Sequence, residues 1–258
     1  ISGSNDTQEK IAMTTPVTQV EKNGNMTMQF YLPSKFNSGN VPSPSREDVK
    51  IVNIEGGYYA VLISWAQDIE NKTLTTSVFN GIKIYSGLHV NLISSDVNKA
   101  VVSGAQSDDV ILSIKDKTLT IKLAIGSLTA SEPTKIDLYH SRNLNKIQAY
   151  NKSLIKSQEK INQTSIIIES KSNALIDLQI ETERLDLLAS LGGRIELEGS
   201  STALNLKVNY GGSCEVEQLK TDQINAQLIG GGYAYVTVRQ LIDAVVIGGS
   251  VLRVYGDP

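Results

Sequence analysis

The sequence predicts a mainly β protein, most of it a β-solenoid, and three observations lead to that prediction. Prolines become scarce after residue 67, apolar and polar residues alternate in short runs, and glycine pairs recur. A period of about nineteen residues is too short for a propeller blade or a paired-helix repeat and suits one coil of a β-helix with two or three short strands. The pairs, separated by 19, 20 and 17 residues, are Gly192-Gly193, Gly211-Gly212, Gly231-Gly232 and Gly248-Gly249.

Composition argues against several classes of protein. Lys and Arg number 24 against 27 Asp and Glu, and a net charge of -3 argues against binding nucleic acid, which requires a basic surface. Two histidines and one cysteine exclude Cys/His zinc sites and disulfide frameworks within one chain. Since no run of consecutive apolar residues is long enough for a spanning helix, we expect no transmembrane segment.

The first part of the chain predicts antiparallel strands joined by loops. Residues 26–32 alternate apolar and polar side chains, and a second strand-like run extends over residues 49–63. The sequence NSGNVPSPS between them, at residues 37–45, is typical of a loop. Within the second run, Glu55-Gly56-Gly57 predicts a bulge or bend.

Residues 1–66 resemble the SOUL haem-binding protein family. The resemblance rests on KIAMTTPV, MTMQFYLPSKF, and the pair DVKI and YAVL, which begin at residues 10, 26, 48 and 59. The family implies an α/β barrel-like domain much longer than this segment, so residues 1–66 would be a partial SOUL-like domain. The start at Ile1 without a methionine fits the expectation of an incomplete domain.

Haem binding is implied by this resemblance alone. Histidine is a common axial ligand of haem iron, and residues 1–66 contain none. Met13, Met26 and Met28 could coordinate iron in principle, but methionines on alternating strands are typical core residues. We therefore expect no cofactor, with haem as the exception if the SOUL-like part is functional.

The uncharged run YYAVLISWA at residues 58–66 has two interpretations. It fits a buried strand that ends the first part of the chain, which we favour. It also fits a signal peptide with Ser64-Trp65-Ala66 before the cleavage point, in which case two neighbouring coding regions have been joined. Residues 67–78 are then a linker or a cleavage-like junction.

From residue 79 onward the alternation predicts strands throughout. Lys115–Thr118 is a polar stretch that favours a hairpin or a coil corner. Residues 177–190 contain strong helix formers, but their apolar positions follow period two, which favours strand. For residues 151–163 the pattern leaves three structures possible, namely a polar loop, the edge of a coil or a short surface helix. Ser172-Asn173 stands where a further glycine pair is expected.

This second part resembles the family called "putative autotransporter adhesin, head GIN domain". The resemblance rests on the glycine pairs and on FNGIKIYSGLHVNL, LTI, IDLY and GGSVLRVYG, which begin at residues 79, 119, 136 and 248. It covers about residues 70–258, with the domain itself at 79–258. The family implies a right-handed β-helix, export to the periplasm, outer-membrane surface or medium, and no established enzymatic activity. It assigns no location to the SOUL-like part.

No group of residues predicts catalysis or metal binding. His89 and His140 are expected at the surface or at corners, and Cys214 is expected to point into the core. Carboxylate pairs are candidates for glycosidase chemistry, although a solvated ladder on the outer face is the simpler interpretation. These pairs are Asp108-Asp109, Glu181/Glu183 and Glu196/Glu198.

Four tyrosines, Tyr210, Tyr233, Tyr235 and Tyr255, lie beside the glycine pairs. Where exposed, they could form a stacking face for a glycan or peptide, although packing at the corners is the simpler expectation. Together with the resemblance to the head GIN domain family, the sequence predicts a non-enzymatic, exported, adhesin-like protein of the bacterial envelope that binds a glycan or protein along strand faces. The alternatives are haem or tetrapyrrole binding through the SOUL-like part, and a carbohydrate-active β-helix.

Overall fold

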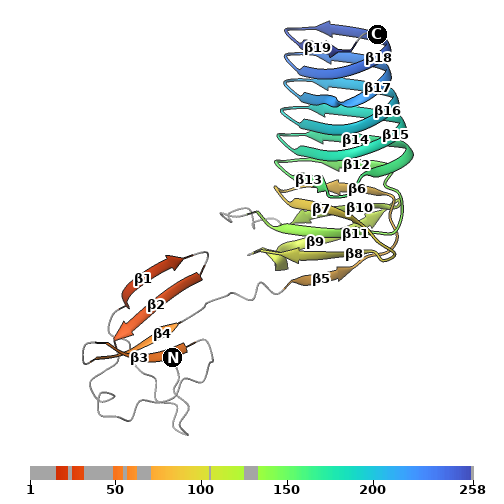
Figure 1. The fold of residues 1–258 in the computed structure, drawn as a ribbon. Coiled ribbons are helices and arrows are strands. Elements are labelled where there is room, and N and C mark those ends of the chain that lie inside the picture. The colour runs from red at the N-terminus through yellow and green to blue at the C-terminus, as the bar shows by residue number, and fades with distance from the viewer. Residues whose placement is uncertain are drawn as a thin grey trace. The chain divides into compact units, whose positions relative to one another are not determined.

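The computed structural model comprises two compact units, Ile1–Ile69 and Glu70–Pro258, each described below by itself (Figure 1). The residues that the structure describes are 16–22, 25–31, 49–54, 57–62, 71–104, 106–124 and 133–256. None of the helical structure in these residues is long and apolar enough to cross a membrane. The segments around Met13 and Ser64-Trp65-Ala66 lie outside the described residues, so the ligand and cleavage interpretations stay predictions.

The described residues of the first unit form four antiparallel strands in the order β1-β2-β4-β3, which agrees with the antiparallel strands expected here. They are β1 (Pro16–Lys22), β2 (Asn25–Tyr31), β3 (Val49–Ile54) and β4 (Gly57–Leu62). Because Ile54 pairs with Gly57, β3 and β4 form a hairpin, and the predicted bulge or bend within a single strand is wrong.

The second unit is a β-solenoid, as the glycine repeat predicts (Figure 1). From residue 146 onward its strands pair in parallel and are β12 (Lys146–Ala149), β13 (Leu154–Ser157), β14 (Ile161–Lys171), β15 (Leu175–Ser190), β16 (Arg194–Asn209), β17 (Ser213–Ile229), β18 (Tyr233–Ile247) and β19 (Val251–Tyr255). Strand β15 excludes the helix considered for residues 177–190, and β13 with the start of β14 occupies most of the open segment 151–163.

The first coils of the solenoid are stacked in a different order from the chain. The strands of these coils are β5 (Lys72–Thr75), β6 (Gly81–Ile84), β7 (His89–Ser94), β8 (Lys99–Ser103), β9 (Val110–Lys115), β10 (Thr118–Leu123) and β11 (Lys135–His140). Strands β12 and β13 pair with β6 and β7, whose other edges pair with β10 and β11. Antiparallel strands β9, β8 and β5 close this end, and β9 with β10 forms the hairpin expected at Lys115–Thr118.

Each long strand consists of two segments that meet at a bend. In β15, alternate side chains from Ile176 to Thr182 are buried, and the alternation then changes phase and resumes at Leu185. The buried side chains of successive coils stack directly on one another, which buries a continuous aliphatic core. We call this bend, near residues 182–184 of β15, the bend corner, and the tight turn between successive strands the turn corner.

The turn corners form a column of residues with positive φ. Seven successive turns each have both central residues in this region, which defines the type I′ turn that reverses a strand within two residues. They are Ser86-Gly87, Asn151-Lys152, Ser172-Asn173, Leu191-Gly192, Tyr210-Gly211, Gly230-Gly231 and Gly248-Gly249. Ser172-Asn173 therefore occupies a turn, as expected from its place in the repeat.

The two glycines of a pair have different roles, which the sequence period does not reveal. Gly211 has a φ of +73° inside the turn, whereas Gly212 follows it and packs against the preceding coil. A Cβ atom on Gly212 would lie 2.5 Å from the carbonyl oxygen of Ala189. In the pair Gly248-Gly249 both residues belong to the turn, so that pair is one residue out of phase with the others. Coil lengths measured by register, from Leu175 through Arg194, Ser213 and Tyr233 to Val251, are therefore 19, 19, 20 and 18 residues.

The bend corners are held by a row of inward polar side chains that the sequence analysis missed. Strand register stacks them as Gln163, Thr182, Ser201 and Thr221. The Thr182 hydroxyl lies 3.0 Å from the carbonyl oxygen of Thr164, and the Ser201 hydroxyl lies 3.1 Å from that of Ala203. These bonds give the inward hydroxyl groups at the bend a partner on the backbone.

Candidate functional site

The outward side chains that follow each turn corner form a surface that we call the ladder face. One row of it, in strand register, is Lys156, Asp177, Glu196, Glu215, Tyr235 and Arg253. Lys156 lies 2.8 Å from Asp177, and this ion pair and its hydrogen bond raise the pKa of the lysine. In the neighbouring row Arg194 bridges Glu196 at 2.7 Å and Glu215 at 2.8 Å. The ladder face is thus a charged surface whose groups hold one another in place.

Aromatic side chains occupy the C-terminal coils of the ladder face. The ring centroids of Tyr233 and Tyr235 are 5.6 Å apart, and the Tyr233 hydroxyl donates to Glu215 Oε1 at 3.2 Å. The Arg253 guanidinium lies 5.4 Å from the centroid of Tyr235. Tyr255, one row further along the strand, is 46% exposed. Aromatic, cationic and anionic groups therefore lie side by side at the spacing of the coils.

The expectation that these tyrosines pack at corners is wrong for three of them. Tyr233, Tyr235 and Tyr255 lie on strands and point outward, because Ala234 and Val236 fill the alternate, inward positions. Tyr210 does lie in a turn corner, but it is 68% exposed and does not pack there.

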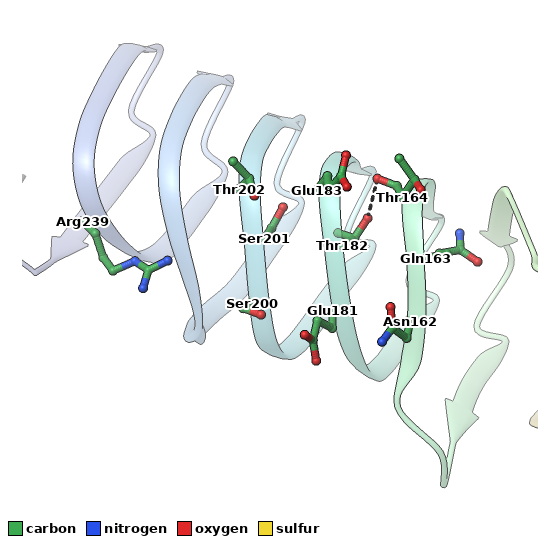
Figure 2. A pocket seen from close by; sticks show the side chains of 10 residues that line it. All are labelled: Asn162, Gln163, Thr164, Glu181, Thr182, Glu183, Ser200, Ser201, Thr202 and Arg239. Atoms are coloured by element: carbon green, nitrogen blue, oxygen red, sulfur yellow. Dashed lines mark hydrogen bonds between the residues drawn. The ribbon is translucent and has the colours of Figure 1, made fainter.

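A second polar surface, which we call the corner groove, follows the bend corners (Figure 2). Figure 2 shows Glu181 and Glu183 on opposite sides of Thr182, whose hydroxyl donates to the Thr164 carbonyl group. The outward groups of the groove come from four strands and are Asn162, Thr164, Glu181, Glu183, Ser200, Thr202 and Arg239. Hydroxyl, amide, carboxylate and guanidinium groups thus line one hollow across several coils.

The three carboxylate pairs singled out from the sequence lie on the surface, each beside a cation. Asp108 is 3.1 Å from Lys72, and Glu181 is 3.4 Å from Lys160. Glu196 and Glu198 point outward on either side of buried Leu197, as predicted, and Glu196 pairs with Arg194. This arrangement agrees with a solvated ladder and gives none of the carboxylates in these three pairs the buried, apolar surroundings that raise the pKa of a general acid.

Both histidines lie at partly exposed positions, as expected. His89 is an outward residue of β7, and burial together with Lys135 and Lys156 lowers its pKa. His140 ends β11, with Nδ1 3.0 Å from the Arg142 carbonyl oxygen, and burial lowers its pKa. The lowered pKa values favour the neutral form of both rings at pH 7.

Cys214 has no solvent exposure and points into the core, as predicted. Burial raises the pKa of its thiol, so the thiolate that nucleophilic chemistry requires does not form at neutral pH. Within the part of the chain that the structure describes, His, Cys, Asp and Glu side chains form no group of three that could hold a metal ion.

Sequence reasoning found part of these two surfaces. It identified Glu181 and Glu183 in the corner groove and three tyrosines of the ladder face, but it missed Arg239 and Arg253. Both arginines reach their surface through the register of successive coils, since Arg253 stacks next to Tyr235. The coil length is the sequence signal that could have found Arg253. Aligning residues that are one coil apart places Arg253 in the same row as Glu215 and Tyr235.

Comparison with known proteins gives two family matches and several similar folds. The model described as "Putative auto-transporter adhesin, head GIN domain" matches residues 78–258, and the model described as "SOUL heme-binding protein" matches residues 1–73. Both resemblances inferred from the sequence are confirmed. A search of curated proteins gives no significant match.

Two solved crystal structures, each described as a "putative adhesin", share the fold. The protein from Bacteroides fragilis is 17% identical, with a TM-score of 0.59 over 72% of this chain and 94% of its own. The protein from Parabacteroides merdae is also 17% identical, with a TM-score of 0.55 over 72% of this chain and 93% of its own. At these identities the likeness concerns the fold.

Proposed function

This chain belongs to the head GIN domain family, and we propose that it is a non-enzymatic, adhesin-like protein of the bacterial envelope that binds a glycan along its ladder face. The proposal depends on one observation above all, the juxtaposition of Tyr233, Tyr235 and Arg253 with Glu215 on adjacent coils. Aromatic rings stack on the apolar faces of sugars, while carboxylate and guanidinium groups bond sugar hydroxyls. These are the two kinds of contact that a glycan needs.

The scaffold supports this function because it holds the binding groups on strands rather than on loops. Adjacent coils are separated by the usual strand spacing of about 4.8 Å, so side chains of one row repeat at fixed intervals. Tyr233 and Glu215 fix each other by their hydrogen bond, which reduces the loss of side-chain entropy when a ligand binds. Such a surface suits an elongated ligand that contacts several coils.

Export and adhesion are supported by the family and by its described relatives. The structures from Bacteroides fragilis and Parabacteroides merdae are each described as a "putative adhesin". A periplasmic, outer-membrane or secreted location for residues 67–258 agrees with a face that binds an external glycan. We propose that the surface carboxylates bind hydroxyl groups rather than hydrolyse glycosidic bonds, because Glu181 and Glu196 lie at the surface in ion pairs with Lys160 and Arg194.

Glycan binding is expected to depend on the tyrosines of the ladder face. Replacing Tyr235 or Tyr255 with alanine removes a stacking surface, and we expect the dissociation constant of a bound glycan to rise about tenfold. A glycan array probed with the full chain identifies the ligand, and isothermal titration calorimetry then measures the affinity of each variant.

Tyr210→Ala is the matched control, because Tyr210 is an exposed tyrosine that lies in a turn corner and not on the strands of the ladder face. It should leave the affinity unchanged. Binding of no glycan, or equal losses in all three variants, contradicts the proposal. Release of reducing ends from the bound glycan contradicts the non-enzymatic part and favours a carbohydrate-active β-helix.

A second candidate function, haem or tetrapyrrole binding, is favoured only by the SOUL match to residues 1–73. The residues present do not supply the expected axial ligand, since that segment contains no histidine. His89 and His140 belong to the solenoid unit, where one lies beside two lysines and the other beside a backbone carbonyl group.

We therefore expect no shift of the Soret band when haem is titrated into the full chain. A saturable shift would contradict this expectation. Its loss on changing Met26 and Met28 to leucine, with Met13→Leu as a separate variant, would assign the ligand to the SOUL-like part. Apomyoglobin under the same conditions is the positive control.

A further inference from the structure

The C-terminal end of the solenoid exposes side chains that are buried one coil earlier. Ile242, Ala244 and Val246 occupy the same inward register as Ile224, Ala226 and Leu228. Leu228 has no solvent exposure, whereas Val246 is 39% exposed. On the opposite side of the coil, Val254 of β19 lies in register with fully buried Val236 and is 43% exposed. The core is thus open at this end in the described residues.

The same end presents two open strand edges. Residues 251–255 of β19 pair with the first segment of β18, and residues 241–247, in the second segment of β18, pair with β17. Within the described residues, neither has a partner on its other edge. Because β19 adds only half a coil, the end is a step, with one side higher than the other.

The opposite end of the solenoid is built differently. There the antiparallel strands β9, β8 and β5 close the stack and interrupt the parallel ladder. Solenoids generally need such caps, because an open apolar end associates with other chains. The contrast identifies the C-terminal step as the end of the described solenoid that is suited to a partner.

We propose that this step is a self-association surface at which two copies of the chain dock end to end about a two-fold axis. The chain reverses at each corner, so β19 runs opposite to the second segment of β18. A two-fold axis parallel to the strands keeps strand directions and exchanges the two sides of the coil. It therefore places β19 of each copy beside the second segment of β18 of the other copy, in the antiparallel direction. The higher side of each solenoid end then occupies the lower side of the other end.

The side chains of the step fit this arrangement. Inward Leu252 and Val254 of one copy would meet inward Ile242, Ala244 and Val246 of the other, which completes the core across the junction. On the outer surface, exposed Arg253 of β19 would lie in the same layer as exposed Asp243 of β18. The symmetry repeats each contact, so opposite charges meet twice.

The oligomeric state of the full chain tests the proposal. Sedimentation velocity and light scattering should show a dimer at micromolar concentration, and Val246→Lys should convert it to a monomer because it places a charge in the junction. Ile167→Lys is the matched control, since Ile167 is an exposed apolar residue on the outer face of β14, far from the step. It should leave the dimer intact. A monomeric native chain, or a dimer that survives Val246→Lys, overturns the proposal.

A charge exchange tests the pairing without touching the core. Asp243→Arg and Arg253→Asp each place like charges together and should each weaken the dimer at least about tenfold, while the double variant should restore it. These residues are exposed, so the exchange also decides the question if Val246→Lys fails to fold, as judged by circular dichroism. Single variants that dimerise as tightly as the native chain contradict the proposed register.

Discussion

Gly212→Val is expected to destabilise the solenoid by about 3 kcal/mol or more, because the new side chain would overlap backbone rather than a movable side chain. A Cβ at this position would lie 2.5 Å from the carbonyl oxygen and 2.6 Å from the carbonyl carbon of Ala189. Ala189 is fully buried in the preceding coil, so it can give way only if two coils separate. Chemical denaturation of the full chain, followed by far-ultraviolet circular dichroism, measures the loss.

Gly231 provides the matched control, because position 231 requires glycine for a different reason from position 212. Its φ is +82°, but a Cβ there would meet nothing within 4 Å. Gly231→Val should therefore cost only the penalty of a left-handed backbone, about 1–2 kcal/mol.

Asparagine distinguishes the two mechanisms, since it tolerates positive φ and already does so at Asn173 in the same column. Gly231→Asn should restore most of the stability that valine removes, and Gly212→Asn should not. Equal losses for valine at the two positions, or rescue by asparagine at both, would contradict the assignment of separate roles.

These two roles show what a sequence period can and cannot predict. The glycine pairs predict the corners and the coil length, because tight reversals and close packing both select glycine. They do not reveal which glycine turns the chain, since both roles occur in neighbouring residues. Asn151-Lys152 forms the same type I′ turn without glycine, so coils of this kind leave no glycine signal in the sequence.

The bend corner was missed because the strand passes through it without turn residues. Its trace in the sequence is a change of phase in the alternation, as between Thr182 and Leu185, combined with a small polar residue at an inward position.

The stacking order of the first coils leaves even less trace in the sequence. Alternation shows which side chains of β6 and β10 point inward, but their pairing is a long-range contact that local pattern does not contain.

The candidate site was predictable to the extent that it depends on alternation. Alternation directs Glu196, Tyr233 and Tyr235 outward, and the coil length then brings them into adjacent rows. The contact of Arg253 with Tyr235 depends on side-chain conformation as well as register, so it could not be read from the sequence. The exposure of the C-terminal coil was also hidden, because Ile242 and Ile224 have the same sequence pattern.

These two isoleucines give the second prediction, since they differ in whether a coil covers them. Ile224 is 3% exposed beneath Ile242, its partner in register, whereas Ile242 is only partly buried. Ile224→Ala removes buried methylene and methyl groups and leaves a cavity, so we expect the free energy of unfolding to fall by about 2–5 kcal/mol. Ile242→Ala removes the same atoms from the open end and should cost less than about 1 kcal/mol in a monomer.

The comparison should be made at two protein concentrations, because the end-to-end dimer would cover Ile242. At low concentration, where the chain is monomeric, the two losses should differ as stated. At high concentration the loss for Ile242→Ala should grow, since the dimer that buries this side chain contributes to stability by mass action. The loss for Ile224→Ala should not change. An equally large loss for both variants in the monomer would contradict the open end, and a loss for Ile242→Ala independent of concentration would contradict its burial in the dimer.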